Sequence, residues 1–344
     1  MNSLERVRIA LQRGQPDRVP IAEFLIDLKV AQAAVPGARD ASDCMDRLDM
    51  DAVGCGPNWR TGPKAADGSY TDEWGVRYRR AMHGAAEALA HPVAGPVATL
   101  ADARAYQPPD PDAPWRLDTL RDLVRRYQGR RAIIFHHRAA FMWAAYLTGL
   151  EGLLEAFLLA PDLADTLMDK VLECNMAVVR HAIHAGADVI VLGDDYADNR
   201  GPMMSPRVFD RFIQPRLARM IAMIHDESAL CIKHTDGNIY PILESIVAAG
   251  PDGLNPIEPV AGMTLARTKA LVGDRVCLVG NIDCGELLSH GTTDQVEAAV
   301  RQAIADAAPG GGYMLTSSNS IHSSVRPENL IAMVQACHRY GVYA

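Results

Sequence analysis

Short apolar runs recur along the chain and are separated by segments with helical spacing. Most of these runs are continuously apolar instead of alternating with polar residues, which is typical of strands buried on both faces, as in parallel sheets. We predict strands at residues 19–24, 51–55, 132–137, 188–193, 230–234, 252–255, 276–281 and 313–317.

Helix patterns lie between most of these runs. Leu163, Leu167 and Val171 repeat at helical spacing after Pro161, which predicts a long helix. Pro215 is expected to break or kink the helix that begins near Ser205-Pro206. Further start signals are a capping box at Thr292 with Gln295, and Pro327 ahead of the last helix.

The alternation of strands and helices predicts an α/β fold, a (β/α)8 TIM barrel in one domain over residues 1–344. Such barrels need about 250 residues, and the surplus falls at about 56–131, as an insertion after the second strand with a hairpin near 67–80. A doubly wound open sheet is the alternative. It is disfavoured because no glycine-rich phosphate loop follows the first strand.

Composition narrows the classes of partner. The chain has 344 residues and a formal net charge of −8, with no basic block. Nucleic acids and anionic membranes attract clustered Lys and Arg, so neither is an expected partner. No apolar run approaches the roughly 20 residues of a membrane span. Seven irregularly spaced cysteines do not suggest a disulfide framework, so a cytoplasmic protein is expected.

Polar residues follow almost every predicted strand. In TIM barrels the chemistry lies at the C-terminal ends of the strands. The candidates at these ends are Glu23, Trp59, His137, Asp194, Asp195, His234, Asp236, Asn281, Asp283, Cys284 and Asn319.

His234 and Asp236 form the main constellation, because residues two apart on an extended chain point the same way. They could bind a metal ion, act as an acid/base pair, or hydrogen-bond to a substrate. Cys284 could complete a metal site, although a small buried thiol is the more ordinary reading. Asp236 could instead cap a helix that starts near Ile239.

Other candidates rest on single features. Asp194 and Asp195 are adjacent carboxylates, of which one is expected to cap a loop. Glu23 is an isolated acid in an apolar run, so its burial suggests a role. His136 and His137 face opposite ways in a strand, so at most one should enter the site. Trp143 is expected in the core.

Several motifs together resemble the uroporphyrinogen decarboxylase superfamily. They are ERVRIALQRGQPDRVPIAEF at the start, DEWGV (72–76), GDDYADNRGPMMSP (193–206), IKHTDGN (232–238), LVGNIDCGELLSHGT (278–292) and GGGYMLTSSNSIHSSVRPENLIAM (310–333). The resemblance spans nearly the whole chain and implies a single (β/α)8 barrel. The superfamily includes porphyrinogen decarboxylases and methyltransferases that exchange methyl groups with a protein-bound corrinoid.

Departures from the family patterns favour the methyltransferase branch. The decarboxylases carry an arginine-rich motif after the first strand, where this chain reads EFLIDLKV without arginine. The methyltransferases often hold zinc through His-x-Cys and a later cysteine. Asp236 and Asn319 stand near those cysteine positions. With oxygen ligands in place of thiolates, the site could hold a harder metal ion, or it could be a metal-free acid/base site.

The leading interpretation is a methyltransferase that moves a methyl group from a small methylated substrate, such as a methyl ether, to a corrinoid on a carrier protein. His234, Asp236, Glu23 and Asp194 are its expected catalytic residues. The expected metal ligands, with zinc as one option, are His234, Asp236 and Cys284. Substrate contacts are expected from Asp195, Asn281, Asp283, Asn319, His137 and Trp59.

Two rivals and the oligomeric state stay open. One rival is a decarboxylase of a small carboxylic acid, with Arg138, Lys233 or Arg200 near the substrate carboxylate. The other is a tetrapyrrole- or metal-binding protein without activity. A homodimer is neither required nor excluded by the sequence.

Overall fold

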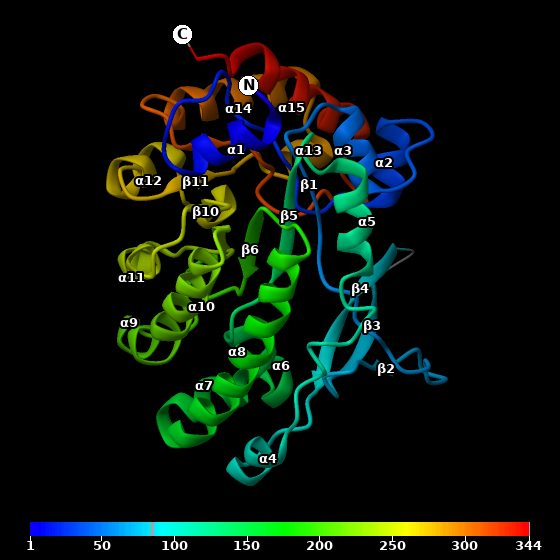
Figure 1. Cartoon of the computed structure of the whole chain (residues 1–344), viewed down its shortest axis with the longest axis vertical. Helices are drawn as coiled ribbons and strands as arrows, with labels where there is room; N and C mark the ends of the chain where they lie inside the picture. Colours follow the sequence, from blue (N-terminus) through cyan, green and yellow to red (C-terminus); the bar gives the residue numbers. More distant parts are fainter. Residues whose placement is uncertain (84–85, 344) are drawn as a thin grey trace.

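A parallel sheet forms the centre of the protein, which is described by a computed structural model over residues 1–83 and 86–343 (Figure 1). All neighbouring strands in this sheet run parallel. Each lies within one of the apolar runs that predicted a strand. In spatial order they are β1 (Ala52–Cys55), β5 (Ala132–His137), β6 (Val189–Gly193), β9 (Leu230–His234), β10 (Gly253–Asn255), β11 (Cys277–Val279) and β12 (Tyr313–Met314).

The first predicted strand, residues 19–24, is not a regular strand. Ile21 forms a single parallel bridge with Leu315. The Ala22 amide donates to the Leu315 carbonyl at 3.1 Å, and the Asp51 amide donates to the Ile21 carbonyl at 2.7 Å. Pro20 has no amide hydrogen to extend the ladder. The segment therefore touches both edges of the sheet, at β12 and at the start of β1, through few bonds.

Most helices cover the outside of the sheet, and the N-terminal one packs against its inner face (Figure 1). Their predicted start signals are confirmed at Pro161, at the Thr292–Gln295 capping box and at Pro327. They are α1 (Ser3–Leu11), α2 (Leu28–Ala34), α3 (Ala41–Arg47), α4 (Leu100–Ala105), α5 (Asp118–Tyr127), α6 (Phe141–Thr148), α7 (Leu150–Leu159), α8 (Pro161–His184), α9 (Pro206–Val208), α10 (Gln214–Asp226), α11 (Leu243–Ala248), α12 (Leu265–Val272), α13 (Leu287–His290), α14 (Thr293–Ala307) and α15 (Pro327–Tyr340).

The helix at Ser205 is interrupted, as Pro215 predicted. The Ser205 hydroxyl accepts a hydrogen bond from the Val208 amide at the start of α9. A π-helical turn at Phe209–Ile213 then separates α9 from α10, which has Pro215 in its first turn. Proline removes one amide donor, and a local change of helical pitch accommodates the loss.

A small antiparallel sheet lies between β1 and β5 in sequence. It consists of β2 (Tyr70–Thr71), β3 (Arg77–His83) and β4 (Ala86–Ala94), and Tyr70 pairs with Tyr78, so the hairpin predicted near 67–80 is present. In Figure 1 it lies in the half of the molecule away from the chain termini. The predicted insertion, 56–131, also contains residues 84–85, which lie outside the described residues.

The hydrophobic core has two parts. The larger fills the space between sheet and helices. The smaller lies on the inner face of the sheet, where α1 packs Val7, Ala10 and Leu11 against alternate strand residues. Gly253 is part of this inner face, because an added Cβ would come within 3.0 Å of the Ile232 and Leu11 side chains. The inner apolar row includes Ile134, Ile232 and Met314.

Within the described residues, no single helix is both long and apolar enough to cross a membrane. Only α6 and α7 taken together reach that length and composition, and they are bent by 101° relative to each other.

Candidate active site

A cavity of about 370 Å³ lies at the C-terminal ends of the strands. Strand alternation explains its lining, because the residues two places beyond the inner apolar row point to the same face. Thus His136 follows Ile134, His234 follows Ile232 and Thr316 follows Met314, and all three line the cavity. The sequence-predicted residues that line it are Glu23, Trp59, His137, Asp195, His234, Asp236 and Asn319.

Asn255, the last residue of β10, fixes the imidazole of His234. Its amide nitrogen donates to the Val279 carbonyl at 3.0 Å and to the Thr316 hydroxyl at 3.1 Å. Its oxygen therefore faces His234 Nδ1, 2.5 Å away, and accepts a hydrogen bond from it. When the ring is neutral, the lone pair is consequently on Nε2.

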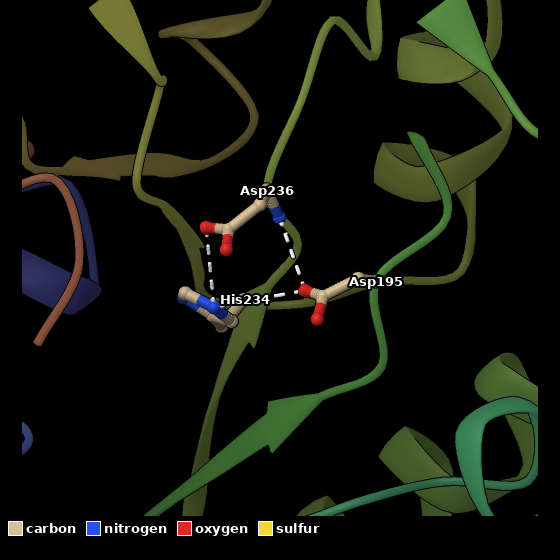
Figure 2. Close-up of side chains that lie close together, drawn as sticks. All are labelled: Asp195, His234 and Asp236. Carbon is tan, nitrogen blue, oxygen red and sulfur yellow. Dashed lines mark hydrogen bonds and ion pairs between the residues drawn. The ribbon is translucent and has the colours of Figure 1, made fainter. Parts of the chain in front are cut away.

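Two carboxylates face this nitrogen (Figure 2). His234 Nε2 is 3.4 Å from Asp236 Oδ1 and 3.7 Å from Asp195 Oδ1. Asp195 Oδ1 also accepts a hydrogen bond from the Asp236 amide at 3.2 Å. Three electron-rich atoms around one point repel one another, so the arrangement requires either a proton shared among them or a bound cation.

Asp236 is held from one side only. Its Oδ2 accepts a hydrogen bond from the Asn319 side chain at 2.6 Å, while its buried Oδ1 has no hydrogen-bond partner among the residues that the structure describes. Burial raises the pKa of Asp236 to about 6, and the nearby His234 opposes that shift. The alternative that Asp236 caps a helix is wrong, because no side chain caps α11 and Asn238 accepts the Tyr240 amide instead.

These three residues fit a metal ion. Ligand atoms of Asp195, His234 and Asp236 all lie within 4.8 Å of one another. Two atoms that each bind a tetrahedral zinc ion at about 2.1 Å are about 3.4 Å apart, close to the distances from Nε2. One imidazole and two carboxylates leave a coordination position for substrate, and the unpartnered Asp236 oxygen suits a ligand.

Cys284 lies outside this cluster, contrary to the prediction that it is a ligand. Its thiol is buried beside the Ser318 hydroxyl, at 3.6 Å, and does not line the cavity. Burial raises the pKa of the thiol, so the thiolate form that binds metals is disfavoured. Asp195, expected to contact substrate, occupies the third position instead.

Asp194 is not positioned for catalysis. Its side chain is fully buried, and its carboxylate accepts hydrogen bonds from the Ala140, Phe141 and Met142 amides at 3.0–3.3 Å. It therefore caps the start of α6, a helix, where a loop cap was expected for one member of the Asp194-Asp195 pair.

Asn281 and Asp283 also do not line the cavity. Asn281 donates to the Ile257 carbonyl at 2.8 Å. Asp283 accepts hydrogen bonds from the Gly285, Glu286 and Leu287 amides, and so it orders the turn before α13. The prediction that these two residues contact substrate does not fit this geometry.

Glu23 is 1% exposed yet lines the cavity. Burial raises its pKa to about 8. Its two oxygens lie 2.7 Å from the Ser317 amide and 2.6 Å from the Ser317 hydroxyl. That hydroxyl is also in hydrogen-bond contact with the Asn319 carbonyl. Because the hydroxyl has one proton for two oxygens, a neutral Glu23 that donates to Ser317 satisfies all three groups.

Both histidines at the end of β5 line the cavity, so the expectation that at most one does is wrong. The His136 ring packs edge-on against Phe24, and the His137 ring is tilted against Trp59. Burial lowers the pKa of His136 to about 4 and that of His137 to about 3. Both rings are therefore neutral near pH 7.

Aromatic rings form one wall of the cavity. Trp143, expected in the core, lines it together with Trp59 and Phe24. The Trp143 indole stacks on Trp74 at 4.3 Å between ring centroids. The guanidinium of Arg116 lies 4.3 Å from the Trp59 ring. No periodic pattern in the sequence predicts that these rings come together, because they belong to segments that are far apart along the chain.

The three candidate cations have different positions. Arg138 lines the cavity. Lys233 is fully buried and points to the opposite face of β9 from His234, where it donates to the carbonyls of Leu192, Asp194 and His234. Burial lowers the pKa of Lys233 to about 8. Arg200 is 93% exposed and pairs with Asp198.

Comparisons with known proteins identify the family of the chain. The family model "Uroporphyrinogen decarboxylase (URO-D)" matches residues 87–340. A uroporphyrinogen decarboxylase of Geobacter sulfurreducens is 28% identical over 252 residues, which is 71% of each chain. A methylcobamide:CoM methyltransferase, MtaA, of Methanosarcina barkeri is 32% identical over 179 residues, covering 52% of this chain and 50% of the relative.

A solved structure supports the fold over the whole chain. A methyltransferase from Methanosarcina mazei superimposes with a TM-score of 0.78 at 20% sequence identity, covering 99% of both chains. Because the family model matches most of the sequence, the chain belongs to the uroporphyrinogen decarboxylase (URO-D) family, whose members include decarboxylases and methyltransferases.

Proposed function

We propose that this protein is a methyltransferase that transfers a methyl group from a small methyl ether to a corrinoid bound on a separate carrier protein. The observation that carries the proposal is the group of ligand atoms from Asp195, His234 and Asp236, which face one point in the cavity. Similarity to an MtaA methyltransferase over about half of the chain supports this branch of the family.

The charge of the cavity also argues against uroporphyrinogen as substrate. A porphyrinogen with eight carboxylates needs several cationic anchors. Among the described residues that line the cavity, Arg138 is the one arginine or lysine, whereas Glu23, Asp195 and Asp236 are acids. A polyanion would therefore find one cationic side chain among the described residues that line the cavity.

Asp195, His234 and Asp236 are the proposed ligands of a metal ion, with zinc as the first candidate. When bound, such an ion would act as a Lewis acid on the ether oxygen, which otherwise is a poor leaving group. Asn255 holds the His234 ring with Nε2 toward the site, and Asn319 holds Asp236 Oδ2 so that Oδ1 remains available.

Glu23 is the proposed proton donor. Its raised pKa keeps it neutral at pH 7 in a site where an ordinary carboxyl group would be ionised. As the methyl group leaves, the oxygen that retains the bonding electrons takes up the proton from Glu23. Ser317 orients the carboxyl group and is in contact with both of its oxygens.

We further propose that the chain is one closed (β/α)8 barrel over 1–344, with 56–131 as its insertion. The supporting observation is that segment 19–24 bonds to both sheet edges. The cavity opening would then be the docking face for the carrier, and the apolar side chain of Leu25, 58% exposed, lies at that opening.

Methyl transfer is tested directly by mixing the purified protein, a methoxylated compound and a reduced corrinoid carrier. We expect the absorbance of the methylated corrinoid to appear and the demethylated alcohol or phenol to accumulate in equal amount. If neither product forms with any methyl ether while the carrier is methylated by its own partner enzyme, the proposed function is wrong.

The metal site is tested by elemental analysis of protein purified without added metal. We expect close to one equivalent of metal in the wild type, and at least a ten-fold loss in His234→Ala and in Asp195→Asn. Cys284→Ser is the matched control and should retain its metal, because its thiol lies outside the cluster. Loss of metal in Cys284→Ser with retention in Asp195→Asn would contradict the ligand assignment.

A decarboxylase of a small carboxylic acid is the second candidate, since Arg138 could bind a substrate carboxylate. Release of CO₂ from labelled substrate, without any need for a corrinoid, would favour it over methyl transfer.

A further inference from the structure

Arg138 has an uncommon environment for an arginine that lines an acidic cavity. It follows β5, and one of its guanidinium nitrogens donates to the Gly193 carbonyl at 2.6 Å. Among the described residues it forms this one hydrogen bond and no ion pair with a carboxylate. A guanidinium has five N–H donors in a planar fork. Most of the fork is therefore available to a ligand in the cavity.

The position of this fork is fixed. The bond to Gly193 ties it to the end of β6, and its guanidinium carbon lies 5.6 Å from the centre of the Tyr146 ring. Tyr146 and Trp143 lie on the same helix, α6, with their ring centroids 5.7 Å apart. Helix α6 therefore contacts the guanidinium of Arg138 and also carries Trp143, which together with Trp59 forms what we call the indole wall of the cavity.

The indole wall is supported from behind. Trp74 stacks on Trp143, and Arg116 lies over Trp59 while also binding Glu73 at 2.6 and 2.9 Å. Trp59 and Trp143 contact each other edge to face at 5.7 Å. Such a braced apolar surface stacks well on a flat ring, because it loses little side-chain freedom when a ligand binds.

We propose, resting on the function proposed above, that the substrate is the methyl ether of a small aromatic acid. Arg138 binds its carboxylate with a bidentate fork, the ring lies against Trp59 and Trp143, and the methoxy oxygen faces Asp195, His234 and Asp236. A cavity of about 370 Å³ suits a one-ring ligand.

The chemistry favours an aromatic ether over an aliphatic one. In the transfer, the methyl carbon bonds to the electron pair of the reduced corrinoid while its bond to oxygen breaks. The electrons of the broken bond stay on the oxygen as a phenolate, which takes the proton of Glu23 to become the phenol. Because phenols are stronger acids than aliphatic alcohols, phenolate is the better leaving group. The substrate carboxylate is unchanged.

The test measures binding without the corrinoid. We would titrate 4-methoxybenzoate and the uncharged 4-methoxybenzamide into metal-loaded protein by calorimetry, with indole fluorescence as a second signal. We expect the wild type to prefer the benzoate at least ten-fold. Arg138→Gln should lose about ten- to a hundred-fold in benzoate affinity, the range for a charge-assisted pair, with little change for the benzamide.

Arg200→Gln is the matched control, because Arg200 is exposed and pairs with Asp198; it should keep the benzoate preference. A non-planar probe, 4-methoxycyclohexanecarboxylate, should bind more weakly than 4-methoxybenzoate in the wild type. Should Arg138→Gln not fold, Arg138→Lys and the comparison of wild-type ligands still give an answer. Equal affinity for benzoate and benzamide in the wild type, or an unchanged preference in Arg138→Gln, overturns the proposal.

The test of the carboxylate site can fail or succeed independently of the test of methyl transfer. If the benzoate preference depends on Arg138 but no methyl group reaches the corrinoid, the carboxylate site stands and methyl transfer is wrong. If methyl transfer occurs equally well with neutral methyl ethers in wild type and Arg138→Gln, the function stands and the carboxylate site is wrong.

Discussion

At the scale of single residues, Glu23 shows how burial sets the chemistry of a carboxyl group. It is 1% exposed, and burial raises its pKa to about 8. Its pKa in the unfolded chain is about 4.3. The folded state therefore disfavours the ionised form, and the wild type loses stability as pH rises from the unfolded value through about 8.

Replacing Glu23 with Gln tests this directly. Residue 23 of the variant cannot ionise. The free energy of unfolding of the variant minus that of the wild type should therefore be constant below pH 4 and increase by several kcal/mol between pH 4 and pH 8. Each unit of pKa shift corresponds to about 1.4 kcal/mol. Urea unfolding at a series of pH values measures this. A pH-independent difference between the two proteins would show that Glu23 is ionised in the folded state.

At the scale of elements, α6 depends on a residue far from it in sequence. Asp194 follows β6 and accepts three backbone amides at the start of α6. Side-chain caps satisfy amides that have no partner within the helix. Because α6 carries Trp143 and Tyr146, this cap also positions one ring of the aromatic wall and the ring beside Arg138.

We expect Asp194→Ala to lower the free energy of unfolding by about 2–4 kcal/mol, because buried amides lose their acceptor. Asp195→Ala is the neighbouring control and, compared in metal-free protein, should change it by about 1 kcal/mol or less, since Asp195 is partly exposed and its acceptor bond is single. Urea unfolding curves compare the two. Similar values for both variants would mean that the cap contributes little.

At the scale of the whole molecule, a buried ion-pair network joins the N-terminal segment to the sheet. Asp51 is fully buried and contacts Arg6 Nη1 at 2.5 Å and Arg18 Nη1 at 2.8 Å. The same carboxylate accepts the Ile21 amide at 3.0 Å. Asp51 immediately precedes β1, so the network lies at the end of the sheet opposite the cavity, where a role in stability is expected.

Asp51→Asn should therefore lower the free energy of unfolding by about 3–5 kcal/mol, because two arginines lose a buried anion. Asp17→Asn is the control. Asp17 is the more exposed partner of Arg6, with 44% of its side chain exposed, so its replacement should lower the free energy of unfolding by about 1 kcal/mol or less. In the folded Asp51→Asn protein, metal content should be unchanged. Metal loss there would mean that the two ends of the sheet are coupled.

The sequence by itself determined the alternation of strands and helices, because continuous apolar runs and helix caps are local signals. It also indicated that His234 and Asp236 share a side of the extended chain, from their spacing of two residues, and that Glu23 is a buried acid, from its apolar neighbours; all three line the cavity. The regular strand expected at 19–24 did not form, because Pro20 limits the ladder.

Only the tertiary structure decided which polar residues share the cavity. Asp194 and Asp195 are adjacent and chemically identical, yet one caps α6 and the other joins His234, because adjacent side chains of an extended segment point to opposite sides. Cys284 and Asp283 follow a strand as His234 does, but their loop directs them toward Ser318 and the α13 turn. Positions in loops depend on packing against distant segments, and no local pattern records that packing.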